Sequence, residues 1–171
     1  MIKRFAPVLV LASVIAVSCK KTNTGCAYTF FNATASDSEV AVLRDSLQSH
    51  SIYNFTADPS GMFYNIVNGG TGDMATGACS QVTVSYTGRL LSGLVFDSTA
   101  PNETTTVTLG QLIEGWQKAI PLVKAGGEII AYVSPTLGYG SQVITDSQGQ
   151  VLIPANSDLI FDINVVSVKN P

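Results

Sequence analysis

The residues that decide the fold are 81–91, which read QVTVSYTGRLL. Val82, Val84 and Tyr86 fall on one face of an extended chain here, and the side chains between them are polar. A strand with one apolar and one polar face is typical of an antiparallel sheet that covers a core on one side. The stretch therefore predicts a half-buried strand, and the chain on either side is expected to supply its neighbours.

Other stretches of the chain repeat this alternation. They are residues 104–109, 128–133 and 158–168, and residues 62–67 form a further expected strand. Residues 115–120 read as a short helix instead, because Pro121 cannot continue a helical hydrogen-bond ladder. Strands with one apolar face and a short helix to cover that face predict an antiparallel α+β domain.

A second helix is expected ahead of these strands. Ser36 and Glu39 have the spacing of a capping box, in which each side chain satisfies a backbone N–H of the other residue. Apolar residues then follow at helical spacing, namely Val40, Leu43 and Leu47. A helix over about residues 37–49 is marginal on its own in water. We therefore expect it to pack on a surface, most simply the outside of the sheet.

The first residues have the form of an export signal. Lys3 and Arg4 precede an apolar run of 13 residues at 5–17, which is too short to span a bilayer. Ser18 and Cys19 close the run in a way that resembles a bacterial lipoprotein cleavage site, where Cys19 becomes the lipidated first residue. The other reading is an ordinary secretory signal cut nearby, with Cys19 incidental.

The charges and the single histidine argue against several function classes. Without the two cations of the leader, 7 basic residues stand against 12 acidic ones, and the only basic cluster is Lys20-Lys21, so nucleic acid is not an expected partner. His50 has no second histidine and no cysteines at zinc spacing beside it, so no metal site is expected. The glycine-rich residues 69–72 lack the Lys-Ser/Thr of a phosphate loop, and nothing else in the sequence indicates a cofactor.

Six short fragments carry a family resemblance. In chain order they are VSYTG at 84–88, GLVFDS at 93–98, LIEGW at 112–116, GYG at 138–140, IP at 153–154 and LIFD at 159–162. Together they resemble the FKBP family of peptidyl-prolyl cis/trans isomerases over about residues 60–171. The resemblance implies a curved antiparallel sheet wrapped around a short helix. It divides the chain into a lipoprotein signal peptide (1–18), a tether with an N-terminal helical extension (19–60) and an FKBP-like isomerase domain (61–171).

The resemblance also implies an aromatic pocket for a proline ring. Trp116 would form its floor, and the walls would be Tyr86, Phe96 and Phe161. Asp97 would orient Tyr86 and polar groups of the ligand. For each of these aromatic residues taken alone, plain core packing is the other reading.

Further residues would hold the substrate backbone, and here the chain departs from the family pattern. Ile113 would bind a substrate carbonyl through its N–H, and Tyr139 would offer its hydroxyl to the peptide. The remaining expected substrate-binding residues are Leu112, Ile153 and Thr105. Thr105 stands where the family usually has a phenylalanine, and the loop from Gly140 to Ile153 is longer than in the small family members.

The implied function is prolyl isomerisation that assists the folding of exported proteins. The expected partners are proline-containing polypeptides, with macrolide-type inhibitors as further ligands and a membrane reached through the lipid anchor. The implied location is the bacterial cell envelope, facing the periplasm or the exterior. The alternative is a non-catalytic module that grips proline-containing or unfolded segments, and Thr105 is the feature that favours it.

The cysteines predict a disulfide in the exported chain. Apart from Cys19, only Cys26 and Cys79 remain, an even number in an oxidising compartment. A bridge between them would pin the N-terminal extension beside the start of the 81–91 strand and leave the proline pocket untouched. The other reading is two free thiols that never meet.

Overall fold

The computed structural model describes residues 26–171, so the predicted signal peptide and Cys19 lie outside the described residues. The strands in chain order are β1 (Thr56–Ala57), β2 (Phe63–Asn68), β3 (Gln81–Leu90), β4 (Val95–Ser98), β5 (Thr105–Thr108), β6 (Gly127–Val133), β7 (Ile144–Thr145), β8 (Val151–Ile153) and β9 (Leu159–Lys169). The α-helices are α1 (Asp37–Ser49) and α2 (Glu114–Ala119), and the 3-10 turns are η1 (Leu109–Gln111), η2 (Ile120–Leu122) and η3 (Pro135–Leu137).

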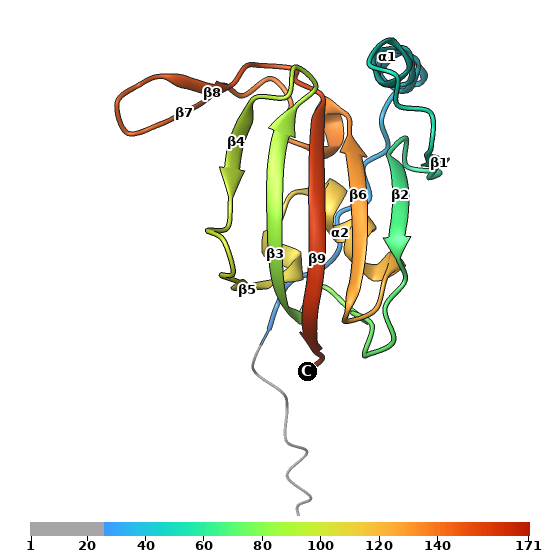
Figure 1. Ribbon diagram of the computed structural model, residues 1–171, viewed down its shortest axis with the longest axis vertical. Helices are drawn as coiled ribbons and strands as arrows, with labels where there is room; N and C mark the ends of the chain where they lie inside the picture. The colour runs from blue at the N-terminus through green and yellow to red at the C-terminus, as the bar shows by residue number, and fades with distance from the viewer. Residues whose placement is uncertain (1–25) are drawn as a thin grey trace, which may run out of the picture.

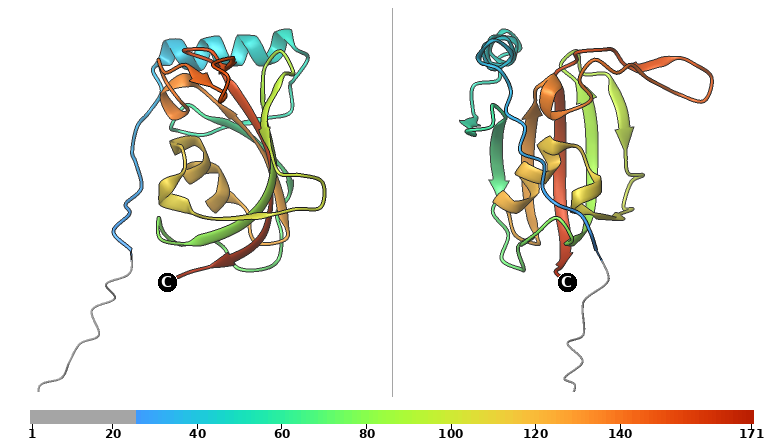
Figure 2. Two further views of the ribbon diagram at one scale, coloured as in Figure 1. Left: turned by 90° about the vertical axis from the view of Figure 1, so that its left-hand side faces the viewer. Right: turned by 180° about the vertical axis from the view of Figure 1, so that it is seen from behind.

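A seven-stranded antiparallel sheet forms the body of the molecule (Figure 1). Its order is β1-β2-β6-β9-β3-β4, with β5 paired to β3, and β7 and β8 form a separate hairpin. The longest pairing joins β3 to β9, and its register shifts opposite Thr83 and Val84, where Val166 of β9 is left without a partner. Bulges bend the strand that carries them, and the sheet curves around α2 (Figure 2). The predicted fold class, a curved sheet wrapped around a short helix, is confirmed.

The main core lies between α2 and the concave face of the sheet. Its fully buried residues include Val82 and Val84 of β3, as the alternation in residues 81–91 predicts. Full burial of such a side chain stabilises the fold by about 1.5–3 kcal/mol. Gly115 lets the helix approach closely, because a Cβ there would lie 2.7 Å from both methyl groups of Val133 in β6. The glycine before Trp116 therefore sets the depth at which the indole ring enters the core.

Helix α1 packs on the opposite face of the sheet, as predicted. Ser36 Oγ accepts from Glu39 N at 3.3 Å, and Glu39 Oε2 accepts from Ser36 N at 3.0 Å, which completes the capping box. Leu43 and Leu47 are fully buried. They contact a row of three side chains that are register partners across β2, β6 and β9, namely Phe63, Tyr132 and Ile160.

Four strands are not predicted by the alternation. β1, β7 and β8 have two or three residues each, and β4 is exposed along most of its length, so none carries a readable period. The longer loop between Gly140 and Ile153 folds as the β7–β8 hairpin, which extends away from the sheet (Figure 1). No helix among residues 26–171 is long and apolar enough to cross a bilayer.

Residues 26–35 form an extended segment that we call the N-terminal strap. It runs along the open side of the sheet, past α2, before the chain turns into α1 (Figure 2). Cys26 forms a disulfide with Cys79, with their Cα atoms 5.8 Å apart. At the other end, Ala35 N donates to Ser60 O at 2.8 Å. The strap is thus held at both ends.

Candidate active site

A cavity of about 330 Å³ opens between the β3–β4–β5 side of the sheet and the start of α2. Its lining residues are Tyr86, Asp97, Thr105, Val107, Gln111, Leu112, Ile113, Trp116, Tyr139 and Phe161. The volume lies in the range of small-ligand pockets, roughly 300–1,000 Å³. Eight of the ten residues that sequence reasoning assigned to the pocket are in this lining, and they come from six separate parts of the chain.

Three aromatic rings meet at right angles at the bottom of the cavity. The Tyr86 and Trp116 ring centroids are 5.0 Å apart at 85°, and those of Trp116 and Phe161 are 5.4 Å apart at 83°. Edge-to-face contacts of this kind add about 0.5–1.5 kcal/mol beyond area burial. Trp116 is only 5% exposed, so its indole ring is a fixed floor.

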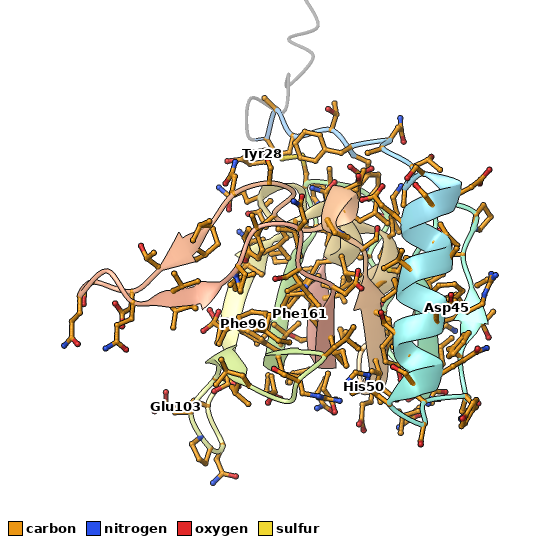
Figure 3. All side chains as sticks on the ribbon, turned by 90° about the horizontal axis from the view of Figure 1, so that it is seen from above. Tyr28, Asp45, His50, Phe96, Glu103 and Phe161 are labelled. Atoms are coloured by element: carbon orange, nitrogen blue, oxygen red, sulfur yellow. A yellow bond between two sulfur atoms is a disulfide. The ribbon has the colours of Figure 1, made fainter. Side chains whose placement is uncertain are left out.

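Phe96 and Ile153 are not among the residues that line the cavity. Phe96 packs edge-on against Phe161, with centroids 5.7 Å apart at 82°, and the two rings are adjacent in Figure 3. Ile153 is buried in the main core through β8. Both side chains were expected to form part of the pocket surface, and this role stays a prediction for each of them.

The polar groups of the cavity are two tyrosine hydroxyls and one carboxylate. Tyr86 Oη donates to Asp97 Oδ2 at 2.6 Å. Burial raises the pKa of Tyr86, and the hydrogen bond to Asp97 raises it further. Burial likewise raises the pKa of Tyr139, with a smaller contribution from the charge of Asp97. Both tyrosines are therefore neutral donors near pH 7, and Asp97 is the only charged side chain in the described lining.

Two lining residues were missed by sequence reasoning. Val107 shares a face of β5 with Thr105, so the alternation in residues 104–109 could have found it. Gln111 had no such signal. Its Nε2 atom donates to Tyr28 Oη of the strap at 2.6 Å. The expectation that the bridged extension leaves the pocket untouched is therefore wrong, because the strap reaches a residue of the rim.

The described residues offer little for metal or acid–base chemistry. Residues 26–171 contain no group of three or more His, Cys, Asp or Glu side chains that could hold a metal ion. His50 lies at the end of α1, away from the Phe96–Phe161 pair, and its Nδ1 is 2.8 Å from Ser46 O (Figure 3). What the cavity offers is an apolar, shaped surface with a few fixed hydrogen-bonding groups.

A second hollow of about 490 Å³ lies near the disulfide and the C-terminus. Its lining includes Cys79, Gln81 and Pro171 but no tryptophan or phenylalanine. Although it is larger, none of its lining residues is a buried aromatic side chain, so we take the smaller aromatic cavity as the candidate site.

Comparison with known proteins agrees with this geometry. Residues 72–166 match the family described as FKBP-type peptidyl-prolyl cis-trans isomerase. A probable FKBP-type peptidyl-prolyl cis-trans isomerase of Haemophilus influenzae is 42% identical over 111 residues, which are 64% of this chain and 44% of that protein. The outer membrane protein MIP of Legionella longbeachae is 39% identical over 112 residues, 65% of this chain and 46% of that one.

The solved structures agree as well. The crystal structure of FkpA from Escherichia coli superposes with a TM-score of 0.64 at 28% identity and covers 77% of this chain and 60% of that one. The chain spans less than half the length of the two curated relatives it matches here.

Proposed function

The chain belongs to the FKBP-type peptidyl-prolyl cis-trans isomerase family, and on that premise we propose that it catalyses cis/trans isomerisation of Xaa-Pro bonds. Its substrates are proline-containing stretches of polypeptides, and its role is to assist the folding of exported proteins. The observation that carries this proposal is the aromatic cavity, in which the rings of Tyr86, Trp116 and Phe161 lock one another beside the Asp97 carboxylate.

Isomerisation needs shape and low polarity rather than a titrating group. The barrier is rotation about a peptide bond, roughly 18–20 kcal/mol, and no bond is broken. Twisting the amide removes resonance and withdraws charge from its carbonyl. A dry apolar cavity therefore favours the twisted amide over the more polar planar form. For a millionfold acceleration, the cavity would have to stabilise the twisted amide over the planar one by about 8 kcal/mol.

The rim residues have geometry suited to holding the substrate backbone. Ile113 precedes α2 in an extended conformation, and within residues 26–171 its N–H has no backbone acceptor. We assign this N–H to a substrate carbonyl and the Tyr139 hydroxyl to the substrate backbone. Leu112 and Thr105 would contact the substrate from the lining, while Phe96 and Ile153 would support the walls. Macrolide-type inhibitors would occupy the same cavity.

A direct test is acceleration of cis/trans exchange in a short Xaa-Pro peptide, followed by NMR or a protease-coupled assay. We expect acceleration by the wild-type protein. Phe96→Ala should lower kcat/KM because it removes the ring behind Phe161, and Asp97→Ala because it frees the Tyr86 hydroxyl. Thr105 in the lining favours the second candidate, a non-catalytic binding module. If micromolar protein binds the peptide but does not accelerate exchange, the protein is a binding module and not an isomerase.

The rate should also be nearly independent of pH between about 6 and 8. Burial raises the pKa of both Tyr86 and Tyr139, so neither hydroxyl ionises in that window. His50, the one histidine of the chain, is bonded at the end of α1 rather than in the cavity. A bell-shaped profile of kcat/KM in this window would contradict a mechanism without a titrating base.

We place the protein in the bacterial cell envelope, anchored through a lipid on Cys19 and facing the periplasm or the exterior. The leader-like residues 1–18 support this placement, as does the name of the Legionella longbeachae relative, an outer membrane protein. The Cys26–Cys79 disulfide also fits an oxidising compartment.

A further inference from the structure

We propose that the disulfide-tied N-terminal strap positions the substrate-binding rim of the cavity, and that Gln117 is the positioning residue between them. The proposal rests on the isomerase function above and adds a part of the chain that lies outside the catalytic core. Two separate contacts carry it, one through Gln117 and one through Tyr28.

The side-chain amide of Gln117 is held between the strap and the rim. Gln117 is 3% exposed. Its Oε1 accepts from Phe31 N at 3.1 Å, and its Nε2 donates to Leu112 O at 2.8 Å. These partners define the orientation of the amide, because a backbone N–H can only donate and a carbonyl can only accept. Gln117 therefore links the strap backbone to the rim backbone through a buried group.

The hydrogen bond from Gln117 to Leu112 O affects the Ile113 N–H, which we proposed as the donor to a substrate carbonyl. Leu112 O and Ile113 N–H belong to one planar peptide unit, in which the carbonyl and the N–H of a trans bond point in opposite directions. When Gln117 holds the Leu112 carbonyl, it also fixes the direction of the Ile113 N–H. This matters because the three residues before α2 lie outside regular strand and α-helix, and within residues 26–171 neither Leu112 O nor Ile113 N has a backbone hydrogen-bond partner.

Tyr28 makes the second contact. Its partner is Gln111, the residue before Leu112. Its hydroxyl accepts from Gln111 Nε2 at 2.6 Å. The base of the Tyr28 side chain also lies close to η1, since a Cβ on Gly110 would be 2.5 Å from Tyr28 Cβ. Gly110 N donates in turn to Ala78 O at 2.7 Å, next to the bridged Cys79. The turn that leads into the rim is thus enclosed by the strap and by the segment to which the strap is tied.

The disulfide limits how far the strap can move from these contacts. Cys26 is two residues from Tyr28 and five from Phe31, so the bridge to Cys79 keeps both contact residues near η1 and α2. Reduction would leave the first part of the strap held by its single hydrogen bonds, each worth little in water. The affinity of the cavity for substrate is therefore expected to depend on the state of the bridge.

The test is peptide binding and exchange measured by NMR on the purified full chain. Tyr28→Phe removes one exposed oxygen from the rim contact, so the fold should be unaffected and the Kd for a Xaa-Pro peptide should rise about threefold to fivefold. Gln117→Leu should raise Kd about tenfold or more. In both variants the maximal exchange rate should change less than Kd, and the Ile113 amide resonance should shift in the free protein.

The disulfide and a matched tyrosine complete the design. Reduction of the bridge, or Cys26→Ser, should raise Kd in the wild type and have a smaller effect in the Gln117→Leu background, because coupled groups are not additive. Tyr53→Phe is the control, since Tyr53 is 70% exposed and lies outside both the strap and the cavity lining. It should leave Kd and the exchange rate unchanged.

The outcomes separate this proposal from the proposed function. If the wild type accelerates exchange but Tyr28→Phe and reduction leave Kd and the Ile113 resonance unchanged, the positioning role is overturned and the isomerase stands. A lower exchange rate at unchanged Kd would indicate loss of folded protein and would also overturn it. If the wild type shows no acceleration, the isomerase function fails, and Kd with the Ile113 resonance still decides the role of the strap.

Discussion

At Gly88 of β3, two aromatic rings occupy the space where a side chain would begin. A Cβ there would lie 2.7 Å from Phe96 Cε2 and 2.9 Å from Phe161 Cε1. Gly88 is the register partner of Asp97 in β4 and of Phe161 in β9. The glycine therefore lets both rings approach the backbone of β3 closely, and Phe161 lines the cavity.

Gly88→Ala is expected to damage both stability and activity. The rings cannot move without disturbing Trp116, so the added methyl group should lower the free energy of unfolding by about 1–3 kcal/mol. It should also lower kcat/KM for a Xaa-Pro peptide, because Phe161 lines the cavity. Denaturant unfolding and the exchange assay measure the two effects.

The matched control for this substitution is Gly69→Ala. A Cβ at Gly69 has no atom within 4 Å, so this variant should keep the stability and activity of the wild type within error. Equal behaviour of the two alanine variants would contradict the packing role assigned to Gly88.

At the scale of elements, one carboxylate ties α1 to the turn that leads to Tyr139. Glu39 Oε1 accepts from Thr136 N at 3.1 Å and from Thr136 Oγ1 at 2.8 Å, in addition to its place in the capping box. Burial alone would raise the pKa of Glu39, but the hydrogen bonds from Ser36 and Thr136 lower it below its usual value. A hollow of about 230 Å³ separates this carboxylate from a second one, Asp158, which precedes β9.

Asp158→Asn should stabilise the protein, with a gain that develops as pH rises from about 4 to about 6 and is complete above about pH 6. Burial raises the pKa of Asp158 to about 6, and the charge of Glu39 adds to the effect. The folded state therefore holds a proton that the unfolded state has lost, and ionisation of Asp158 lowers stability as pH rises from about 4 to about 6. The amide removes this loss, so the variant should gain about 1 kcal/mol at pH 7.5, because solvent screens a half-buried group.

The gain should disappear below about pH 4, where Asp158 is protonated in both states. Denaturant unfolding of both proteins at several pH values measures this dependence. Asp45→Asn, the same change from carboxylate to amide at an exposed position of α1 (Figure 3), is the control. A gain that stays constant from pH 4 to pH 8 would contradict the assignment to Asp158.

At the scale of the whole molecule, different elements pack on the two faces of the sheet. The concave face holds α2, the cavity and the strap, whereas α1 covers the convex face near one end of the strands (Figures 1 and 2). The strap begins at Cys26, which follows the proposed lipidated Cys19 by seven residues. If Cys19 carries the anchor, the chain between the membrane and the disulfide is therefore short.

Cys19→Ser should release the protein from the membrane or leave it unprocessed. One acyl chain binds membranes only marginally, whereas the several chains of a bacterial lipoprotein anchor it stably. The wild type should therefore remain with the membrane fraction after a salt wash, as immunoblotting of cell fractions would show. A wild-type protein that is soluble, with an unmodified N-terminus, would contradict the anchor.

The sequence by itself determined the features whose signals are local. The alternation of Val82, Val84 and Tyr86 and the capping box at Ser36 each depend on neighbours a few residues away, so strand β3 and helix α1 could be predicted with their limits. The aromatic residues of the cavity were also predicted, because the fragments that carry them stand in family order.

Only the tertiary structure decided the features that join distant segments through single contacts. The strap meets the rim through bonds that span 83 residues (Tyr28 to Gln111) and 86 residues (Phe31 to Gln117), and neither bond leaves a period in the sequence. Phe96 of β4 packs against Phe161 of β9 across Gly88 of β3, so that contact too depends on three segments that are distant in the sequence. A periodic apolar pattern records burial against a whole face, whereas one polar bond between distant residues depends on the finished packing that brings its two atoms together.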